Sequence, residues 1–117
     1  MSRVAYINAQ LLDPASGLDT PGALLCDNEL IKDFGPELFK DGVPEGIKVI
    51  DCQGFHLVPG LVDMRVQLRE PGEEYKDTLE SAGRTASAGG VTSMVCLPNT
   101  TPVIDDISVL EFVARRA

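Results

Sequence analysis

The sequence has little basic charge and no long apolar run. Among its 117 residues, 10 are Lys or Arg and 18 are Asp or Glu, which gives a formal net charge of −8. Nucleic-acid binding surfaces need clustered Lys and Arg to displace counterions, so a nucleic acid is not an expected partner. No stretch approaches the roughly 18 consecutive apolar residues of a membrane helix, and no basic end precedes an apolar core at the N-terminus. We therefore expect a cytoplasmic protein that does not insert into a membrane.

Cysteine and histidine are also scarce. The cysteines, Cys26, Cys52 and Cys96, are odd in number and far apart. That spacing fits neither a disulfide framework nor a paired-cysteine zinc site, so we expect reduced, buried thiols. The only histidine is His56.

The chain divides into two halves of different texture. The 44 % hydrophobic content is that of a globular protein. In residues 1–54, short apolar segments alternate with turn residues, which predicts a small β-meander. Asp27 and Asn28 separate two of these segments and suit the positive φ angles of a tight hairpin.

Residues 55–117 show the rhythm of two βα units. A nearly continuous apolar run over residues 55–64 predicts a strand buried on both faces of a parallel sheet. A second strand is expected over residues 91–97, because that segment is rich in β-branched residues. Two such units are not a finished fold, because a closed (β/α)8 barrel usually needs about 250 residues. We expect the native chain to be longer.

Helices are expected after each of these strands. Asp77 and Glu80 have the spacing of a capping box, and Gly89–Gly90 can supply the left-handed stop. A phosphate-binding loop is the weaker interpretation of this glycine pair, because no Lys-Ser/Thr follows it. Asp105 and Asp106 suit the start of a second helix, which Arg115–Arg116 would end.

Three segments carry a resemblance to a known family. They are residues 68–72 (LREPG), 88–92 (AGGVT) and 98–100 (PNT). With them the chain resembles the N-terminal part of dihydroorotases, which belong to the amidohydrolase superfamily. The resemblance implies an α/β fold in which residues 1–54 form part of a small flanking β-sandwich domain and residues 55–117 begin a (β/α)8 TIM barrel.

The resemblance also implies a substrate site. In dihydroorotases, the residues that correspond to Arg69 and Asn99 hold the carboxylate of the substrate. Both residues follow predicted barrel strands, at the edge where barrel enzymes place their sites. A guanidinium fork and an amide suit a small anionic ligand.

The sequence departs from the family at the metal site. The family pattern is Asp-x-His-x-His, whereas this chain has Asp63, Arg65 and Gln67 at these positions. Alternation along a strand would place Arg65 and Gln67 on one face, but a guanidinium has no lone pair to offer and a neutral amide is a poor zinc ligand. We therefore expect no metal and no catalytic residue from this chain, although the family uses zinc. Without metal, Asp63 is expected to form a salt bridge with Arg65.

Other polar residues have plainer interpretations. His56 lies near the start of the predicted strand, so we expect a structural histidine rather than a ligand. Glu73 and Glu74 follow a Pro-Gly turn and are expected to be solvated.

Three hypotheses on function remain open. The leading one is a non-catalytic dihydroorotase homologue, a pseudoenzyme of pyrimidine biosynthesis with a structural or regulatory role. The resemblance implies an oligomer and names aspartate carbamoyltransferase as the first partner to test. The second is an active zinc-dependent hydrolase, a cyclic amidohydrolase with metal ligands from later strands. The third is a stand-alone binding module, which would unfold cooperatively by itself.

Overall fold

The computed structural model describes residues 2–117 and shows a mixed α/β chain that divides into two compact units. The first unit ends at Pro59 and the second begins at Gly60. The boundary lies after residue 54, where the texture of the sequence changes, because residues 56–57 still pair with the sheet of the first unit. No helix within residues 2–117 has the length and apolar character needed to cross a membrane.

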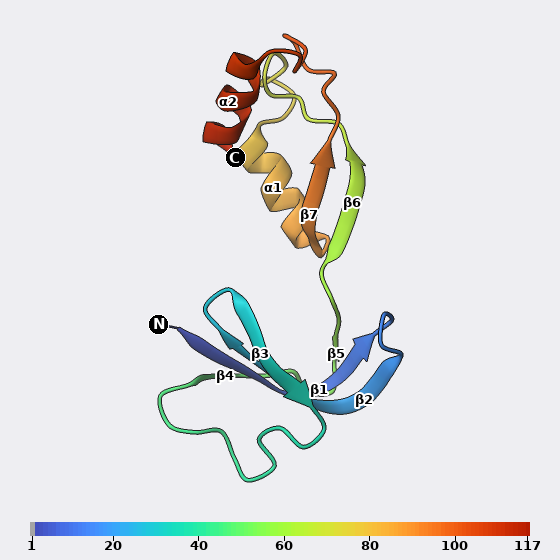
Figure 1. Cartoon of the computed structure of the whole chain (residues 1–117), viewed down its shortest axis with the longest axis vertical. Coiled ribbons are helices and arrows are strands. Elements are labelled where there is room, and N and C mark those ends of the chain that lie inside the picture. Colours follow the sequence, from blue (N-terminus) through green and yellow to red (C-terminus); the bar gives the residue numbers. More distant parts are fainter. Residues whose placement is uncertain (1) are drawn as a thin grey trace. The chain divides into compact units, whose positions relative to one another are not determined.

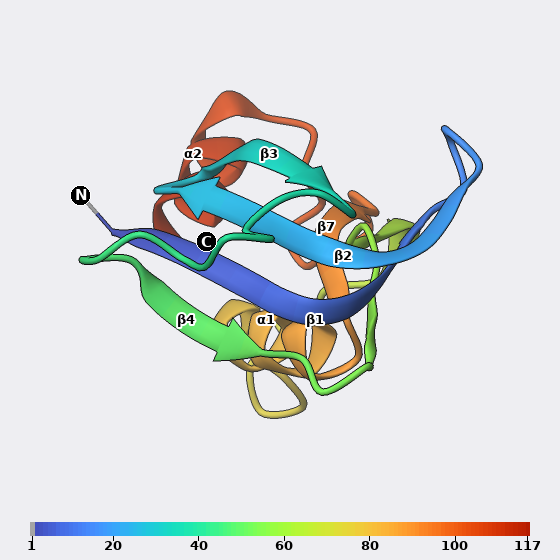
Figure 2. The ribbon, with the colours of Figure 1, turned by 90° about the horizontal axis from the view of Figure 1, so that it is seen from below.

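The first unit is one five-stranded sheet with the order β3-β2-β1-β4 (Figures 1 and 2). Its strands are β1 (Arg3–Asp13), β2 (Leu18–Asp27), β3 (Leu30–Gly35), β4 (Lys48–Asp51) and β5 (His56–Leu57). The first three strands pair antiparallel, as the predicted meander requires. The buried apolar residues of this sheet are small or aliphatic: Ala5, Ala9, Leu11 and Ala23.

The meander prediction is wrong for the last two strands. Both β4 and β5 pair with β1 in the parallel direction. A parallel neighbour needs a crossover connection, and the long loop between β3 and β4 supplies it. Local patterning cannot reveal this choice, because the same alternating strand suits either direction. Asn28 alone takes a positive φ, of 54°, in the hairpin, while Asp27 stays in β2.

The second unit has the predicted order of strand, helix, strand and helix. Its elements are β6 (Leu61–Val66), α1 (Leu79–Ala88), β7 (Val91–Cys96) and α2 (Ile107–Arg116). The strands β6 and β7 pair in the parallel direction, and α1 packs against β7 (Figure 1). This is the arrangement of a βα repeat, while the complete barrel and the sandwich remain predictions.

The apolar run predicted as one strand is divided between the two units. Its first part forms β5 and its last part lies in β6, which continues to Val66. The predicted burial on both faces is wrong for this chain, because β6 is exposed from Leu61 to Arg65. The interruption falls at residues 58–60, where Pro59 has no N–H to donate to a ladder. As a result, His56 lies in the sheet of the first unit rather than at the start of β6.

The helix ends are set by local hydrogen bonds. Thr78 is the N-cap of α1, and it exchanges the two capping-box hydrogen bonds with Ser81 at 3.2 and 2.9 Å. The capping box predicted from Asp77 and Glu80 is therefore wrong by one residue, since the observed pair is Thr78 and Ser81. The prediction for α2 is confirmed, because Asp106 caps it by accepting a hydrogen bond from the Ser108 N–H at 2.7 Å.

Candidate functional site

The ends of β6 and β7 bring the two predicted anion-binding residues to one edge of the sheet. Val66 and Cys96 are register partners, and the Leu97 N–H donates to the Val66 carbonyl at 2.8 Å. Arg69 and Asn99 each follow these partners by the same number of residues. The loops that carry them therefore leave the sheet side by side, as the carboxyl ends of parallel strands do.

The end of β6 is irregular near Asp63, Arg65 and Gln67, the positions at which the resemblance implies a metal motif. The register runs from Asp63 opposite Met94 to Val66 opposite Cys96, so β6 contains one more residue than β7 over this stretch. Such a bulge turns side chains away from simple alternation and is frequent beside active sites. Because of this bulge, strand alternation alone does not place the side chains of residues 65 and 67 on one face of the sheet.

Asp63 is bound to the main chain of this bulge. Its Oδ1 accepts a hydrogen bond from the Arg65 N–H at 3.0 Å. The predicted salt bridge is wrong: within residues 2–117, no ion pair joins the Asp63 carboxylate to the Arg65 guanidinium. Asp63 thus shapes the backbone at the strand end, and the Arg65 side chain beside it is exposed.

The residues at this edge do not fit a zinc ion. Arg65 is cationic and Gln67 offers only a neutral amide, while the Asp63 carboxylate is engaged by a backbone N–H. In the part of the chain that the structure describes, no group of three His, Cys, Asp or Glu side chains could hold a metal. The prediction of buried thiols is wrong, because Cys26 and Cys52 are half-buried and Cys96 is exposed. Cys96 is close in sequence to this edge, but partial desolvation raises the pKa of its thiol and so disfavours the thiolate.

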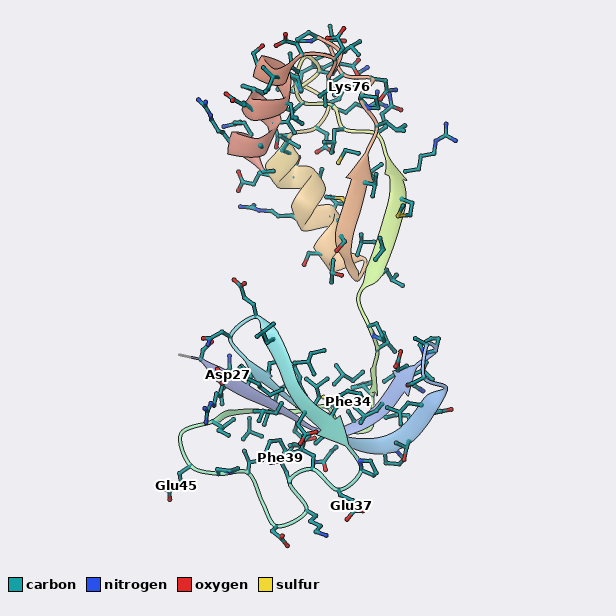
Figure 3. The ribbon with its side chains drawn as sticks, in the orientation of Figure 1. Asp27, Phe34, Glu37, Phe39, Glu45 and Lys76 are labelled. Carbon is teal, nitrogen blue, oxygen red and sulfur yellow. The ribbon has the colours of Figure 1, made fainter. Side chains whose placement is uncertain are left out.

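Arg69 is held by an acidic neighbour in its own loop. Its Nη1 donates to Glu73 Oε2 at 2.9 Å, and the Lys76 ammonium binds the other oxygen of the same carboxylate. Figure 3 labels Lys76 in the loop region beyond the ends of β6 and β7. Hydrogen bonds from Lys76 and then from Arg69 lower the pKa of Glu73. The prediction of a solvated Glu73 is wrong, because two cations converge on a half-buried carboxylate.

Glu70, in the loop that follows β6, is a residue of this site that the sequence analysis did not predict. Only 2 % of its surface is exposed, although it is an ionisable side chain in that loop. Its Oε2 accepts a hydrogen bond from the Leu79 N–H at 2.8 Å, and its Oε1 accepts one from Arg116 Nε at 2.7 Å. These bonds, the Leu79 N–H first, lower the pKa of the carboxyl group despite its burial. No local sequence pattern indicates this burial, because the Arg116 partner is 46 positions away.

The loop after β6 packs tightly on the loop after β7. The Thr101 N–H donates to the Pro71 carbonyl at 3.1 Å. Gly72 has a φ of +106°, and a Cβ there would lie 2.0 Å from the Thr101 carbonyl oxygen. Thr100 is buried, and its hydroxyl donates to the Pro102 carbonyl at 2.8 Å. The two loops therefore form one packed surface, on which Asn99 is exposed and Arg69 is half-buried.

The chemistry available at this surface is anion recognition. The Arg69 guanidinium offers several N–H donors in a planar fork, and Asn99 offers an amide. A carboxylate is the ligand that such a fork binds in a bidentate manner. In this structure the Glu73 carboxylate binds the Arg69 guanidinium.

Comparisons with known proteins agree with this picture. The model of the dihydro-orotase-like family matches residues 54–117. The chain is 49 % identical over 116 residues to a dihydroorotase of Wolbachia sp. subsp. Brugia malayi, covering 98 % of this chain and 26 % of the relative. It is 48 % identical over 115 residues to a dihydroorotase of Ehrlichia chaffeensis, covering 97 % of this chain and 26 % of the relative. The chain thus spans about a quarter of the length of these curated relatives.

Solved structures show the same fold at lower sequence identity. The L-hydantoinase (dihydropyrimidinase) from Arthrobacter aurescens superposes with a TM-score of 0.82 at 22 % identity, over 100 % of this chain and 25 % of that chain. The D-hydantoinase from Bacillus sp. AR9 gives a TM-score of 0.75 at 20 % identity, over 97 % of this chain and 24 % of that chain. The fold is therefore that of the N-terminal part of these hydrolases.

Proposed function

The chain belongs to the dihydro-orotase-like family, and from this membership we propose that it is part of a non-catalytic homologue that acts in pyrimidine biosynthesis in the cytoplasm. The observation that carries the proposal is the end of β6, where Arg65 and Gln67 stand in place of metal-binding histidines. Hydrolysis of a cyclic amide by this family uses a metal to polarise the carbonyl and to supply hydroxide near neutral pH. A cation and an amide at these positions cannot take that role.

A retained anion site supports a role in binding. Arg69 and Asn99 extend from adjacent strand ends, and the loops beneath them are fixed by buried Glu70 and by the close contact at Gly72. We assign to this pair weak binding of a small carboxylate such as dihydroorotate. The proposal keeps the substrate-binding chemistry of the family and removes its metal chemistry.

The partner proposed for the full-length protein is aspartate carbamoyltransferase. A homologue that has lost catalysis can still bind other subunits of an oligomeric assembly. The family resemblance implies that aspartate carbamoyltransferase, the enzyme of the preceding step, is such a subunit. The protein would then act as a structural or regulatory subunit.

A second candidate function is an active zinc-dependent dihydroorotase. It is favoured by the two dihydroorotases that are 48 to 49 % identical to this chain. In this case all metal ligands would come from other parts of the full-length protein.

One experiment separates the two candidates. Dihydroorotate hydrolysis is measured for the purified full-length protein with added zinc, beside a buffer blank, and bound zinc is measured in the same sample. The non-catalytic proposal expects a rate equal to the blank and co-purification with the aspartate carbamoyltransferase of the same organism. A zinc-dependent rate would overturn it in favour of the active enzyme.

A further inference from the structure

The buried carboxylate of Glu70 connects three segments of the second unit that are distant in sequence. It accepts hydrogen bonds from the first residue of α1, through the Leu79 N–H, and from Arg116 in the last turn of α2. Its own backbone belongs to the loop that follows β6. A charged group that is 2 % exposed is tolerated only because both of its oxygens are satisfied.

Arg69 lies between two buried neighbours in this loop. Leu68 is 3 % exposed and Glu70 is 2 % exposed, whereas Arg69 is half-buried and its guanidinium pairs with Glu73. The Arg69 carbonyl also accepts a hydrogen bond from the Glu73 N–H at 2.7 Å. The backbone that carries the guanidinium is thus fixed on both sides, and a bidentate contact needs such a fixed direction.

We propose that Glu70 is a positioning residue that, held by Leu79 and Arg116, orients the Arg69 guanidinium for a planar carboxylate ligand. This inference rests on the proposed anion site. Arg116 at the end of α2 would then affect the affinity of the anion site through Glu70, although α2 itself would not contact the ligand. Glu70 itself does not touch the ligand, because its oxygens are occupied within the fold.

The test measures dihydroorotate binding to the native full-length protein by isothermal titration calorimetry. Glu70→Gln keeps the size of the side chain but places an amide where two N–H donors converge. We expect affinity for dihydroorotate to fall about tenfold, since loss of orientation weakens a preorganised contact. Arg116→Gln removes one of the two partners on the more exposed side and should weaken binding about threefold.

A second background separates positioning from a general effect on folding. In a protein that carries Arg69→Lys, the ammonium is a point charge without a fork, so its orientation matters little. There, Glu70→Gln should change affinity by less than about twofold. Leu11→Ala, in the core of the first unit, is the matched destabilised control and should leave dihydroorotate affinity unchanged.

The outcomes are distinct. Unchanged affinity of Glu70→Gln beside a binding wild type would overturn the positioning role and leave the anion site intact. An equal loss in the Arg69 and Arg69→Lys backgrounds would overturn it as well, because a general structural effect acts in both. If the wild type does not bind dihydroorotate, the proposed anion site fails and the positioning role fails with it.

Discussion

Arg69 and Glu73 form an ion pair, with Arg69 Nη1 2.9 Å from Glu73 Oε2, at the point where the family resemblance implies a bound carboxylate. The two residues are four positions apart in one loop, and Lys76 binds the second carboxylate oxygen. The Glu73 carboxylate therefore occupies the Arg69 guanidinium that the carboxylate of a ligand would bind. Ligand binding has to displace Glu73 or share the fork with it.

This competition predicts that Glu73→Gln strengthens anion binding. The amide keeps the shape of the side chain but loses the charge that attracts Arg69. Because the pair is partly exposed, its net strength is small, so the gain in dihydroorotate affinity should be about 1.4- to fivefold. Glu37→Gln, which breaks the exposed pair with Lys40 in the first unit, is the control and should have no effect. Weaker binding by Glu73→Gln would show that Glu73 supports the site rather than competing for it.

Two glycine substitutions should have opposite effects on stability. In Gly72→Ala, the new methyl group would meet the Thr101 carbonyl at 2.0 Å in a positive-φ conformation, so we expect a loss of about 2 kcal/mol or more. Gly83 lies inside α1 with no atom near a Cβ, so Gly83→Ala should add about 0.5–1 kcal/mol through helix propensity. Denaturant unfolding of the full-length protein checks both signs. Equal stability of the two variants would contradict the tight contact between the loops.

The stability of the protein should depend on pH through Glu70. Its pKa is lowered from the ordinary value of 4.5 in the folded state, so the folded state binds fewer protons than the unfolded state at acidic pH. The stabilisation is complete above the ordinary pKa and is lost as pH falls through about 4.5 towards the lowered value. In Glu70→Gln this contribution is absent, so its unfolding free energy should fall less over that range. Parallel pH profiles for the wild type and the variant would contradict this assignment.

Introducing a histidine pair at positions 65 and 67 tests whether the rest of the full-length protein provides the other ligands of a zinc site. Arg65→His combined with Gln67→His should raise zinc bound to the full-length protein if its other ligands survive, because imidazole suits zinc and a guanidinium does not. Bound zinc is measured by atomic absorption after dialysis. Arg84→His, on the exposed face of α1, is the matched control for non-specific binding. No gain over this control would mean that the loss extends beyond the end of β6.

Much of the local structure follows from the sequence alone. The cap at Asp106 and the positive φ of 81° at Gly90 are as predicted, and the exposed pair of Glu80 with Arg84 is equally local. They depend on residues within about one helical turn of each other, where the backbone offers few alternatives. The absence of metal-binding histidines at Arg65 and Gln67 is likewise a property of the sequence.

Contacts between distant segments were decided by the tertiary structure. The parallel pairing of β4 with β1, the bulge near Asp63 and the burial of Glu70 each depend on a partner from another element. Glu70 and Arg116 are 46 positions apart, so no periodicity or cap could reveal that an acidic residue in a polar stretch would be enclosed. Sequence specified the groups that can bind an anion, and packing decided that Glu70 is enclosed beside them, because burial is set only when distant segments meet.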